Sequence, residues 1–305
     1  MSIRPVKRVT RSQPTLEGAG VHLRRAFGFG ATEEFDPFLL FDDFRGDAPE
    51  EYLAGFPWHP HRGIETITYV LAGEVEHGDS MGNRGVIGAG DVQWMTAGKG
   101  IIHQEMPRGD KQGRMHGFQL WANLPAAKKL TAPRYQEVKG RDIPESIDDD
   151  GTRARIVVGE YHGQQGAVDG IAARPVYLDI SVPPGKRKTI PVETTRQAFA
   201  YVFAGGGKFE GASTPQAIKT DVIDGGGAAA ALAATGTAVE NRNLVLFDRG
   251  DEVVVQAGDQ GIRFLLVAGE PLQEPVAWRG PIVMNTRDEL QRAFAQLNDG
   301  TFLNG

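Results

Sequence analysis

Short stretches of apolar and β-branched residues recur along most of the chain, and glycine, proline, aspartate and asparagine separate them. Residues 64–72 combine isoleucine, threonine, tyrosine and valine, which favours a strand. Residues 36–44 form an apolar run bounded by turn-forming residues, which predicts a buried strand. The same reasoning predicts strands near residues 6–9, 21–27, 92–95, 101–106, 115–124 and 153–158. The chain is therefore expected to be all-β.

A helical pattern stands out near the C-terminus. Thr286 followed by Glu289 is the signature of a capping box, and Gly300 is suited to end the helix. Apolar residues recur between them at helical spacing, namely Leu290, Ala293, Phe294 and Leu297. We expect this short helix to pack its apolar face on a β domain.

Two parts of the chain resemble each other. Residues 69–73 read Tyr-Val-Leu-Ala-Gly, and residues 201–205 read Tyr-Val-Phe-Ala-Gly. A Gly-Asp pair followed by an Ala-Gly pair recurs at the same spacing, in residues 90–98 and 250–258. This indicates an internal duplication. The second copy is longer, and its glycine- and alanine-rich residues 225–236 are expected to form a surface loop.

A segment rich in turn formers and acidic residues separates the two copies. With 305 residues, the chain is long enough for two domains. We expect an N-terminal metal-binding domain over residues 1–135 and a linker over about 136–149. A C-terminal domain that carries the helix would then cover residues 150–305.

Charge and composition exclude several classes of protein. The net charge of -6 argues against a chain-wide surface for nucleic acid or anionic membrane. With a cysteine count of 0, the chain has no disulfide framework and no thiolate metal site. No apolar run approaches the ~20 residues of a membrane helix, and the first residues lack the apolar core of a signal peptide. We therefore expect a cytoplasmic protein.

Histidines and acids at alternate positions predict a metal site. His59 and His61 stand one residue apart before a strand, and His103 and Glu105 repeat this spacing. Side chains at i and i+2 of a strand point to the same face, so each pair can project together. Three imidazoles and a carboxylate suit a first-row transition metal, and open positions suit iron(II) and dioxygen chemistry.

Other candidates for this site remain open at the level of sequence. Glu65 shares the parity of His59 and His61, so parity does not decide between Glu65 and Glu105. His116 lies on another predicted strand and is a further candidate to line the cavity. His77 precedes a Gly-Asp turn and is expected to be solvated. The second copy lacks histidines at the matching positions, which predicts one metal site per chain and a structural second domain.

Four motifs resemble the pirin family of the cupin superfamily. They are the Asp-Pro-Phe-Leu-Leu-Phe-Asp of residues 36–42, the Phe-Pro-Trp-His-Pro-His-Arg-Gly of residues 56–63, residues 93–103 and residues 280–286. The motifs run from near the N-terminus to the C-terminal helix, so the resemblance covers essentially the whole chain. It implies a bicupin, with two stacked jelly-roll or β-sandwich barrel domains and one iron in the N-terminal barrel.

The resemblance also implies a ligand set and an activity. Carried over to this sequence, the metal ligands are His59, His61, His103 and Glu105. Iron(II) is the expected cofactor, and other divalent first-row metals suit the same ligands. The implied activity is that of a quercetin 2,3-dioxygenase, with a flavonol-like substrate, O2 and Glu105 as the catalytic base. Phe56, Trp58 and Met95 are expected to line the pocket.

The family resemblance carries a second functional hypothesis. Some pirins resemble redox-responsive regulators that act on transcription factors or metabolic enzymes. In that case the iron would change a protein surface through its oxidation state, and the partner would be a protein. A wide opening to the metal would favour the enzyme, whereas a closed pocket beneath a charged patch would favour the regulator.

Overall fold

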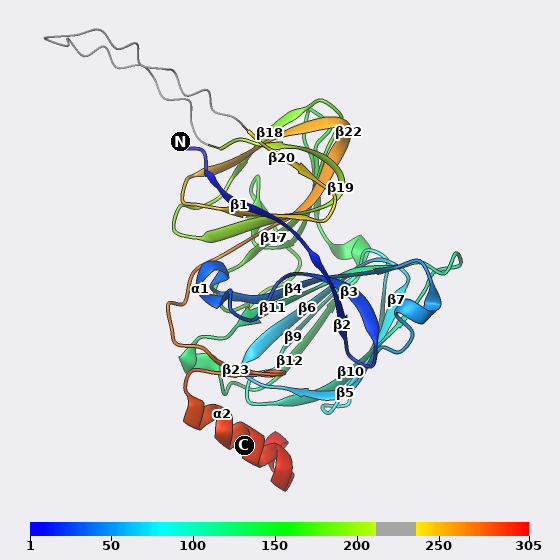
Figure 1. The fold of residues 1–305 in the computed structure, drawn as a ribbon, viewed down its shortest axis with the longest axis vertical. Coiled ribbons are helices and arrows are strands. Elements are labelled where there is room, and N and C mark those ends of the chain that lie inside the picture. The colour runs from blue at the N-terminus through cyan, green and yellow to red at the C-terminus, as the bar shows by residue number, and fades with distance from the viewer. Residues whose placement is uncertain (212–235, 305) are drawn as a thin grey trace, which may run out of the picture.

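A computed structural model describes residues 1–211 and 236–304 of the chain. Two β-rich bodies are stacked along the long axis, and a C-terminal helix lies at the far end of the lower one (Figure 1). The expectations of an all-β fold and of a C-terminal helix are confirmed. Residues 225–235 of the glycine- and alanine-rich segment lie outside the described residues.

The lower body is built from two sheets that enclose a cavity. The larger sheet has the order β12 (Arg134–Val138), β9 (Val92–Thr96), β6 (Ile64–Ala72), β11 (Met115–Asn123), β4 (Phe38–Gly46), β3 (Val21–Phe27) and β2 (Gln13–Glu17). The smaller sheet has the order β5 (Phe56–His61), β10 (Ile101–Arg108), β7 (Glu74–Asp79) and β8 (Arg84–Gly88). Short elements lie between the strands along the chain, namely α1 (Thr32–Phe35) after β3 and 3-10 turns at Pro49–Glu51 after β4 and Ala126–Lys128 after β11.

The upper body contains one large, strongly curved sheet. Its order is β1 (Val6–Arg11), β21 (Asn243–Phe247), β19 (Gln197–Phe209), β22 (Glu252–Gly269), β17 (Val176–Val182), β14 (Arg153–Val158) and β13 (Glu145–Ile147). Two further strands pair outside this order, β18 (Arg187–Pro191) with β22 and β20 (Thr237–Glu240) with β19. Two small hairpins form separate two-stranded sheets. They are β15 (Glu160–Tyr161) with β16 (Gln164–Gln165), and β23 (Ala277–Arg279) with β24 (Ile282–Met284).

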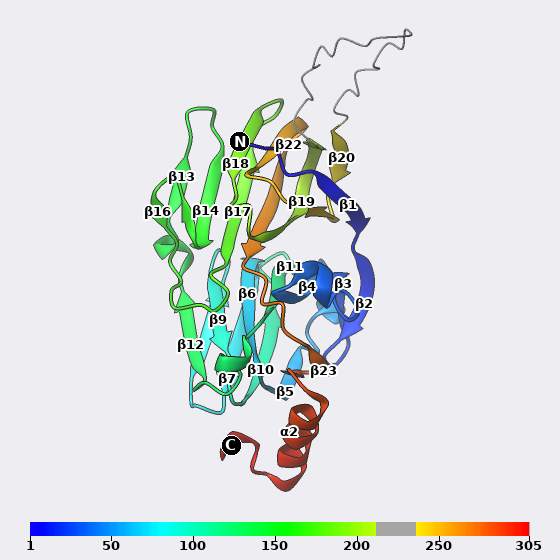
Figure 2. The same ribbon diagram turned by 90° about the vertical axis from the view of Figure 1, so that its left-hand side faces the viewer.

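The two ends of the chain cross to the opposite body. The N-terminal strand β1 pairs with β21 in the upper body before the chain descends to β2 (Figure 2). At the other end, β24 forms a bridge from Ile282 to Arg62 in the lower body, and α2 (Arg287–Asp299) follows it. The exact domain boundaries stay a prediction, but each body clearly includes residues from the far end of the chain.

The capping box predicted for the helix is present. The side chain of Thr286 accepts a hydrogen bond from the backbone of Glu289, and the Glu289 carboxylate accepts one from the Thr286 backbone. Gly300 ends the helix in the left-handed conformation with φ of +78°. The apolar face packs beside β24 and Ile102 of the lower body. The final 3-10 turn, Phe302–Asn304, packs against the same cluster.

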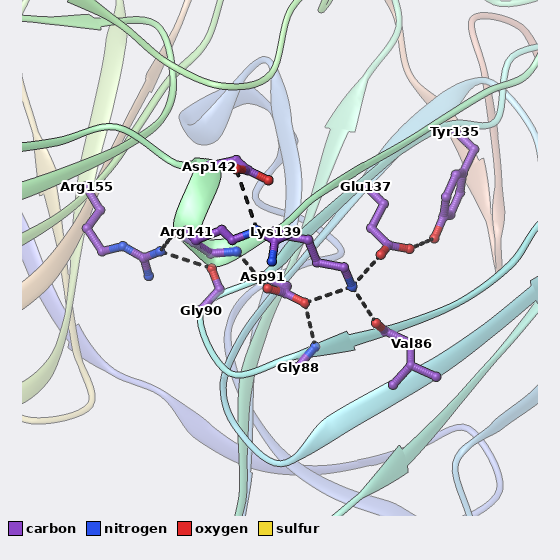
Figure 3. Close-up of polar contacts among 11 residues, drawn as sticks. Val86, Gly88, Gly90, Asp91, Tyr135, Glu137, Lys139, Arg141, Asp142 and Arg155 are labelled. Atoms are coloured by element: carbon purple, nitrogen blue, oxygen red, sulfur yellow. Dashed lines mark hydrogen bonds and ion pairs between the residues drawn. The ribbon is translucent and has the colours of Figure 1, made fainter.

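A group of ion pairs and hydrogen bonds connects the segment between the two bodies to the lower body (Figure 3). Lys139 binds the carboxylates of Asp91 and Glu137. Arg155, on β14 of the upper body, donates to the Gly90 carbonyl. The cation of Lys139 and that of Arg155 are bonded to protein oxygens, which favours a structural role for this cluster over an anion site.

Within residues 1–211 and 236–304, no helix is both long and apolar enough to cross a membrane.

Candidate metal centre

Three histidines converge where β5 and β10 pair. The antiparallel register sets His103 directly opposite His59, and Ile101 opposite His61. One ligand atom from each histidine lies within 4.8 Å of the others. Among the described residues, these three histidines form the group able to hold a metal ion. The i, i+2 spacing within β5 therefore does project His59 and His61 together, as predicted.

Two backbone carbonyls orient the imidazoles of β5. His59 Nδ1 lies 2.8 Å from the Pro57 carbonyl oxygen, and His61 Nδ1 lies 3.1 Å from that of Pro281. A carbonyl only accepts hydrogen bonds, so both Nδ1 atoms carry the proton and both Nε2 atoms present a lone pair. This is the arrangement of metal-binding histidines whose second nitrogen is held by a carbonyl.

The spacing of the two free nitrogens fits one ion. His59 Nε2 and His61 Nε2 lie 3.1 Å apart, and neither can donate a hydrogen bond to the other. With metal–nitrogen bonds of about 2.0–2.1 Å, two ligands at right angles would lie about 3 Å apart. The pair therefore has the separation of adjacent ligands on a single metal.

His103 supplies a third neutral imidazole. It is buried, and neither of its ring nitrogens has a hydrogen-bond partner. Burial, followed by the neighbouring histidines, holds the pKa of His103 well below its ordinary value. Burial also lowers the pKa of His61 to about 3 and lowers that of His59. Neutral imidazoles with unpaired nitrogens are what a metal requires.

Glu105 faces the same cavity but stands slightly apart from the histidines. Its carboxylate is buried and lines the cavity with His59 and His61. The hydroxyl of Thr68 donates to Glu105 Oε1 at 2.8 Å. Burial raises the pKa of Glu105 to about 7, against the opposing effect of the Thr68 hydrogen bond. Glu105 does not belong to the group formed by the three histidines, so its role as a ligand stays a prediction.

A glycine allows the chain to turn directly after the ligand pair. Gly63 has φ of +77°, and a Cβ there would lie 1.9 Å from the carbonyl oxygen of Val283. Its N–H donates to the Gly98 carbonyl, which joins the turn after β5 to the segment that precedes β10. Close approach of backbones explains why glycine is needed at this position.

Glu65 points away from the histidines. The turn at Gly63 ends β5 at His61, and β6 begins afresh at Ile64, so the parity of His59 and His61 does not continue to Glu65. Glu65 instead accepts a hydrogen bond from Thr96 Oγ1. The expectation that parity would place Glu65 on the same face is therefore wrong, because alternation holds only within one unbroken strand.

Two further histidines, His77 and His116, lie in different surroundings from those of the cluster. His77 is 1% exposed and stacks on Tyr135, with ring centroids 4.8 Å apart, so the expectation of a solvated side chain is wrong. The reason is that β7 continues through Asp79 and buries the residues expected to form a turn. His116 faces the upper body, where its ring centroid lies 6.1 Å from that of Phe203, and it pairs with Asp43 of β4 in the lower body. It is not among the residues that line the metal cavity.

A cavity of about 440 Å³ opens beside the histidines. Of the three residues expected to line it, Phe56 does so. Trp58 is 55% exposed outside the cavity, and Met95 packs in a separate apolar cluster. The remaining walls are largely apolar. The residues that line them include the polar side chains of Thr68 and Gln119, the aromatic rings of Trp121 and Trp278, and Gly280 and Pro281.

Sequence reasoning missed the contribution of the C-terminal hairpin. Pro281, which orients His61, belongs to a motif that was noted in the sequence, yet no local pattern connects it to the histidines. Thr68 and Gln119 were also missed, although both point inward from predicted strands. Alternation along those strands could have nominated them as interior polar residues.

Comparison with known proteins identifies the class. A family model described as pirin matches residues 20–122, and one described as the pirin C-terminal cupin domain matches residues 177–303. Together with the two β bodies, these matches define a two-domain cupin. The chain belongs to the pirin family, as its motifs predicted.

Individual relatives agree with this assignment. A pirin-like protein of Caulobacter vibrioides is 43% identical over 303 residues, which cover 99% of this chain and 100% of the relative. Pirin of Homo sapiens is 37% identical over 284 residues, which cover 92% and 88%. Among solved structures, a quercetin 2,3-dioxygenase from Acinetobacter baumannii superposes with a TM-score of 0.83 at 28% identity, covering 98% of both chains.

Proposed function

We propose that this protein is a non-haem iron dioxygenase that opens a flavonol such as quercetin with O2. The observation that carries the proposal is the mostly apolar cavity of about 440 Å³ that reaches the histidine cluster. A closed pocket would have favoured the regulatory hypothesis, whereas an open cavity offers a small aromatic molecule access to the centre. The similarity to the Acinetobacter baumannii enzyme supports the same reaction class.

His59, His61, His103 and Glu105 are the residues proposed to hold the ion. The unpaired nitrogens of His103 and the converging Nε2 atoms of His59 and His61 fit this role. Three nitrogens and one oxygen suit iron(II) and leave positions open on a six-coordinate ion. Bound iron(II) would act as a Lewis acid for the substrate oxygen and as the redox partner of dioxygen.

The protein residues would then handle the substrate and its proton. The apolar walls, including Phe56, exclude water from the bound flavonol. Glu105 is the base that takes the proton of the flavonol 3-hydroxyl, and Thr68 orients its carboxylate. Overall, one flavonol and one O2 are consumed, and ring opening releases carbon monoxide.

The test is anaerobic reconstitution with iron(II), followed by quercetin loss and oxygen uptake on exposure to air. We expect equal consumption of the two reactants with release of carbon monoxide. Both His59→Ala and Glu105→Ala should abolish turnover. His22→Ala is the matched control, because His22 is exposed on β3 and away from the cavity.

A wild-type protein that holds iron at full occupancy but does not consume quercetin would contradict the proposal. The redox-regulator hypothesis would then take precedence, and the next search would be for a protein partner whose binding depends on the oxidation state of iron.

A further inference from the structure

A series of aromatic contacts leads from the histidine cluster to the surface. The ring of His61 meets Trp121 edge to face, with centroids 5.0 Å apart. The ring centroid of Trp121 lies 6.0 Å from that of Trp278. Trp278 in turn stacks on Phe29, with ring centroids 3.8 Å apart and ring planes 24° apart. His61, Trp121, Trp278 and Phe29 all line the same cavity. One wall of the cavity is therefore aromatic along its length.

The outer end of this wall is open to solvent. Phe29 is 59% exposed, although a large apolar side chain gains stability from burial. It lies in the turn after β3, whereas Trp278 comes from the hairpin near the other end of the chain. Two segments far apart in sequence thus join their aromatic rings at the cavity rather than in the core.

Trp278 is held in a defined position relative to the metal centre. Its indole Nε1 donates to the Gly280 carbonyl at 2.8 Å. The next residue, Pro281, accepts the hydrogen bond that orients His61. One short hairpin therefore holds both the imidazole of His61 and the indole of Trp278 in place.

We propose that Phe29 and Trp278 form a second subsite, which binds an aromatic ring of the substrate remote from its reacting end. The preferred substrate would carry two linked, planar ring systems, one at the histidines and one against this aromatic pair. The placement of the first ring rests on the proposed function. Aromatic rings pack favourably on one another beyond simple burial, so the pair selects for the second ring.

The experiment measures binding without oxygen, using the iron(II)-loaded full chain and isothermal titration calorimetry. The probes are quercetin, flavone, which has two ring systems but lacks the 3-hydroxyl, and catechol, which has one ring. Trp278→Ala and Phe29→Ala remove the subsite, and Trp278→Phe keeps an aromatic ring. Trp58→Ala is the matched control, because Trp58 is exposed outside the cavity.

We expect Trp278→Ala to raise the Kd of quercetin and flavone about tenfold, with a smaller rise for Phe29→Ala. Trp278→Phe should restore most of the affinity, and the Kd of catechol should be unchanged in every variant. In steady state with O2, Trp278→Ala should raise KM for quercetin and leave kcat close to that of the wild type. A merely structural role would lower catechol affinity and kcat as well.

Two results would overturn the subsite: no binding of flavone to the wild type, or an unchanged Kd for both two-ring probes in Trp278→Ala. Failure of the proposed function looks different. If flavone binds in a manner that depends on Trp278 but quercetin is not consumed, the subsite stands and the dioxygenase does not. If quercetin is consumed and its Kd is the same in Trp278→Ala as in the wild type, the dioxygenase stands and the subsite does not.

Discussion

The hydroxyl of Tyr69 in the lower body donates a hydrogen bond to Asp179 in the upper body at 2.7 Å. The reciprocal contact runs from Tyr201 in the upper body to Asp43 in the lower body at 2.9 Å. Tyr69 and Tyr201 occupy matching positions in the duplicated sequence, and all four residues are buried. The two copies therefore hold each other through the same contact made in both directions.

Removing either hydroxyl should loosen the interface between the two bodies. We expect Tyr69→Phe and Tyr201→Phe each to lower the free energy of unfolding by about 2 kcal/mol, because a hydrogen bond to a buried carboxylate is lost. Urea unfolding measures the change. Tyr52→Phe is the control, since the Tyr52 hydroxyl donates only to a neutral carbonyl within the lower body, that of Gly113. Equal losses in all three variants would contradict a special role for the interface.

Gly63→Ala should damage both the fold and the metal centre. The new Cβ would meet the Val283 carbonyl oxygen at 1.9 Å, so the hairpin that orients His61 must move. Gly300→Ala is a matched control, because its φ of +78° nearly equals that of Gly63 and nothing lies within 4 Å. Gly300→Ala should cost about 1 kcal/mol from backbone strain alone.

We expect the loss of unfolding free energy in Gly63→Ala to exceed that of Gly300→Ala by about 2 kcal/mol or more. Iron(II) affinity, measured by competition with a chelator, should fall only in Gly63→Ala. If both variants bind iron as the wild type does, the hairpin does not position His61.

Glu65 should make stability depend on pH. Burial raises its pKa from 4.5 to about 7, against the hydrogen bond from Thr96. Between these values the unfolded chain has released the proton that the folded protein still holds, so stability falls as pH rises from about 4.5 to about 7. A shift of this size amounts to about 3 kcal/mol across the window.

Glu65→Gln keeps the shape of the side chain and removes its titration. Urea unfolding of the metal-free wild type and variant at several pH values measures the effect. The wild type should lose stability relative to Glu65→Gln as the pH rises through the window. Parallel profiles for the two proteins would show that Glu65 is ionised in the folded state.

Thr68 should control the metal centre through Glu105. The Thr68 hydroxyl donates a hydrogen bond to the Glu105 carboxylate and also lies 2.7 Å from Gln119 Oε1. We expect Thr68→Val to weaken iron(II) affinity about tenfold, since residues that orient metal ligands typically have effects of this size. Thr66→Val, two residues earlier on the same strand and equally buried, is the control.

Iron(II) affinity can again be followed by competition with a chelator. An unchanged affinity in Thr68→Val would mean that Glu105 does not depend on Thr68. An equal loss in Thr66→Val would instead indicate a general effect of burying valine in this strand.

Local patterns predicted much of the fold. The capping box of Thr286 and Glu289 involves residues three apart, so its geometry follows from the helix itself. The paired spacing of His59 and His61 works in the same way within β5. These predictions succeeded because the period of a single strand or helix determines which side chains share a face.

The incorrect predictions arose where one element ends and another begins. Parity carried from His61 to Glu65 failed at Gly63, whose positive φ restarts the alternation. His77 was expected to be solvated because the following Gly-Asp resembles a turn, yet β7 continues through Asp79. A turn-forming pair does not end a strand when neighbouring strands on both sides supply hydrogen bonds.

By itself, the sequence determined the all-β class, the duplication, the pirin family and the presence of two ligand-type pairs at strand spacing. Only the tertiary structure brought the three histidines to one point, and only it placed Pro281 against His61 across 220 positions of sequence. The exposed stack of Phe29 on Trp278 is likewise visible only in the folded protein. Spacing along the chain governs contacts within an element, whereas contacts between distant segments depend on how whole surfaces pack, which no short pattern encodes.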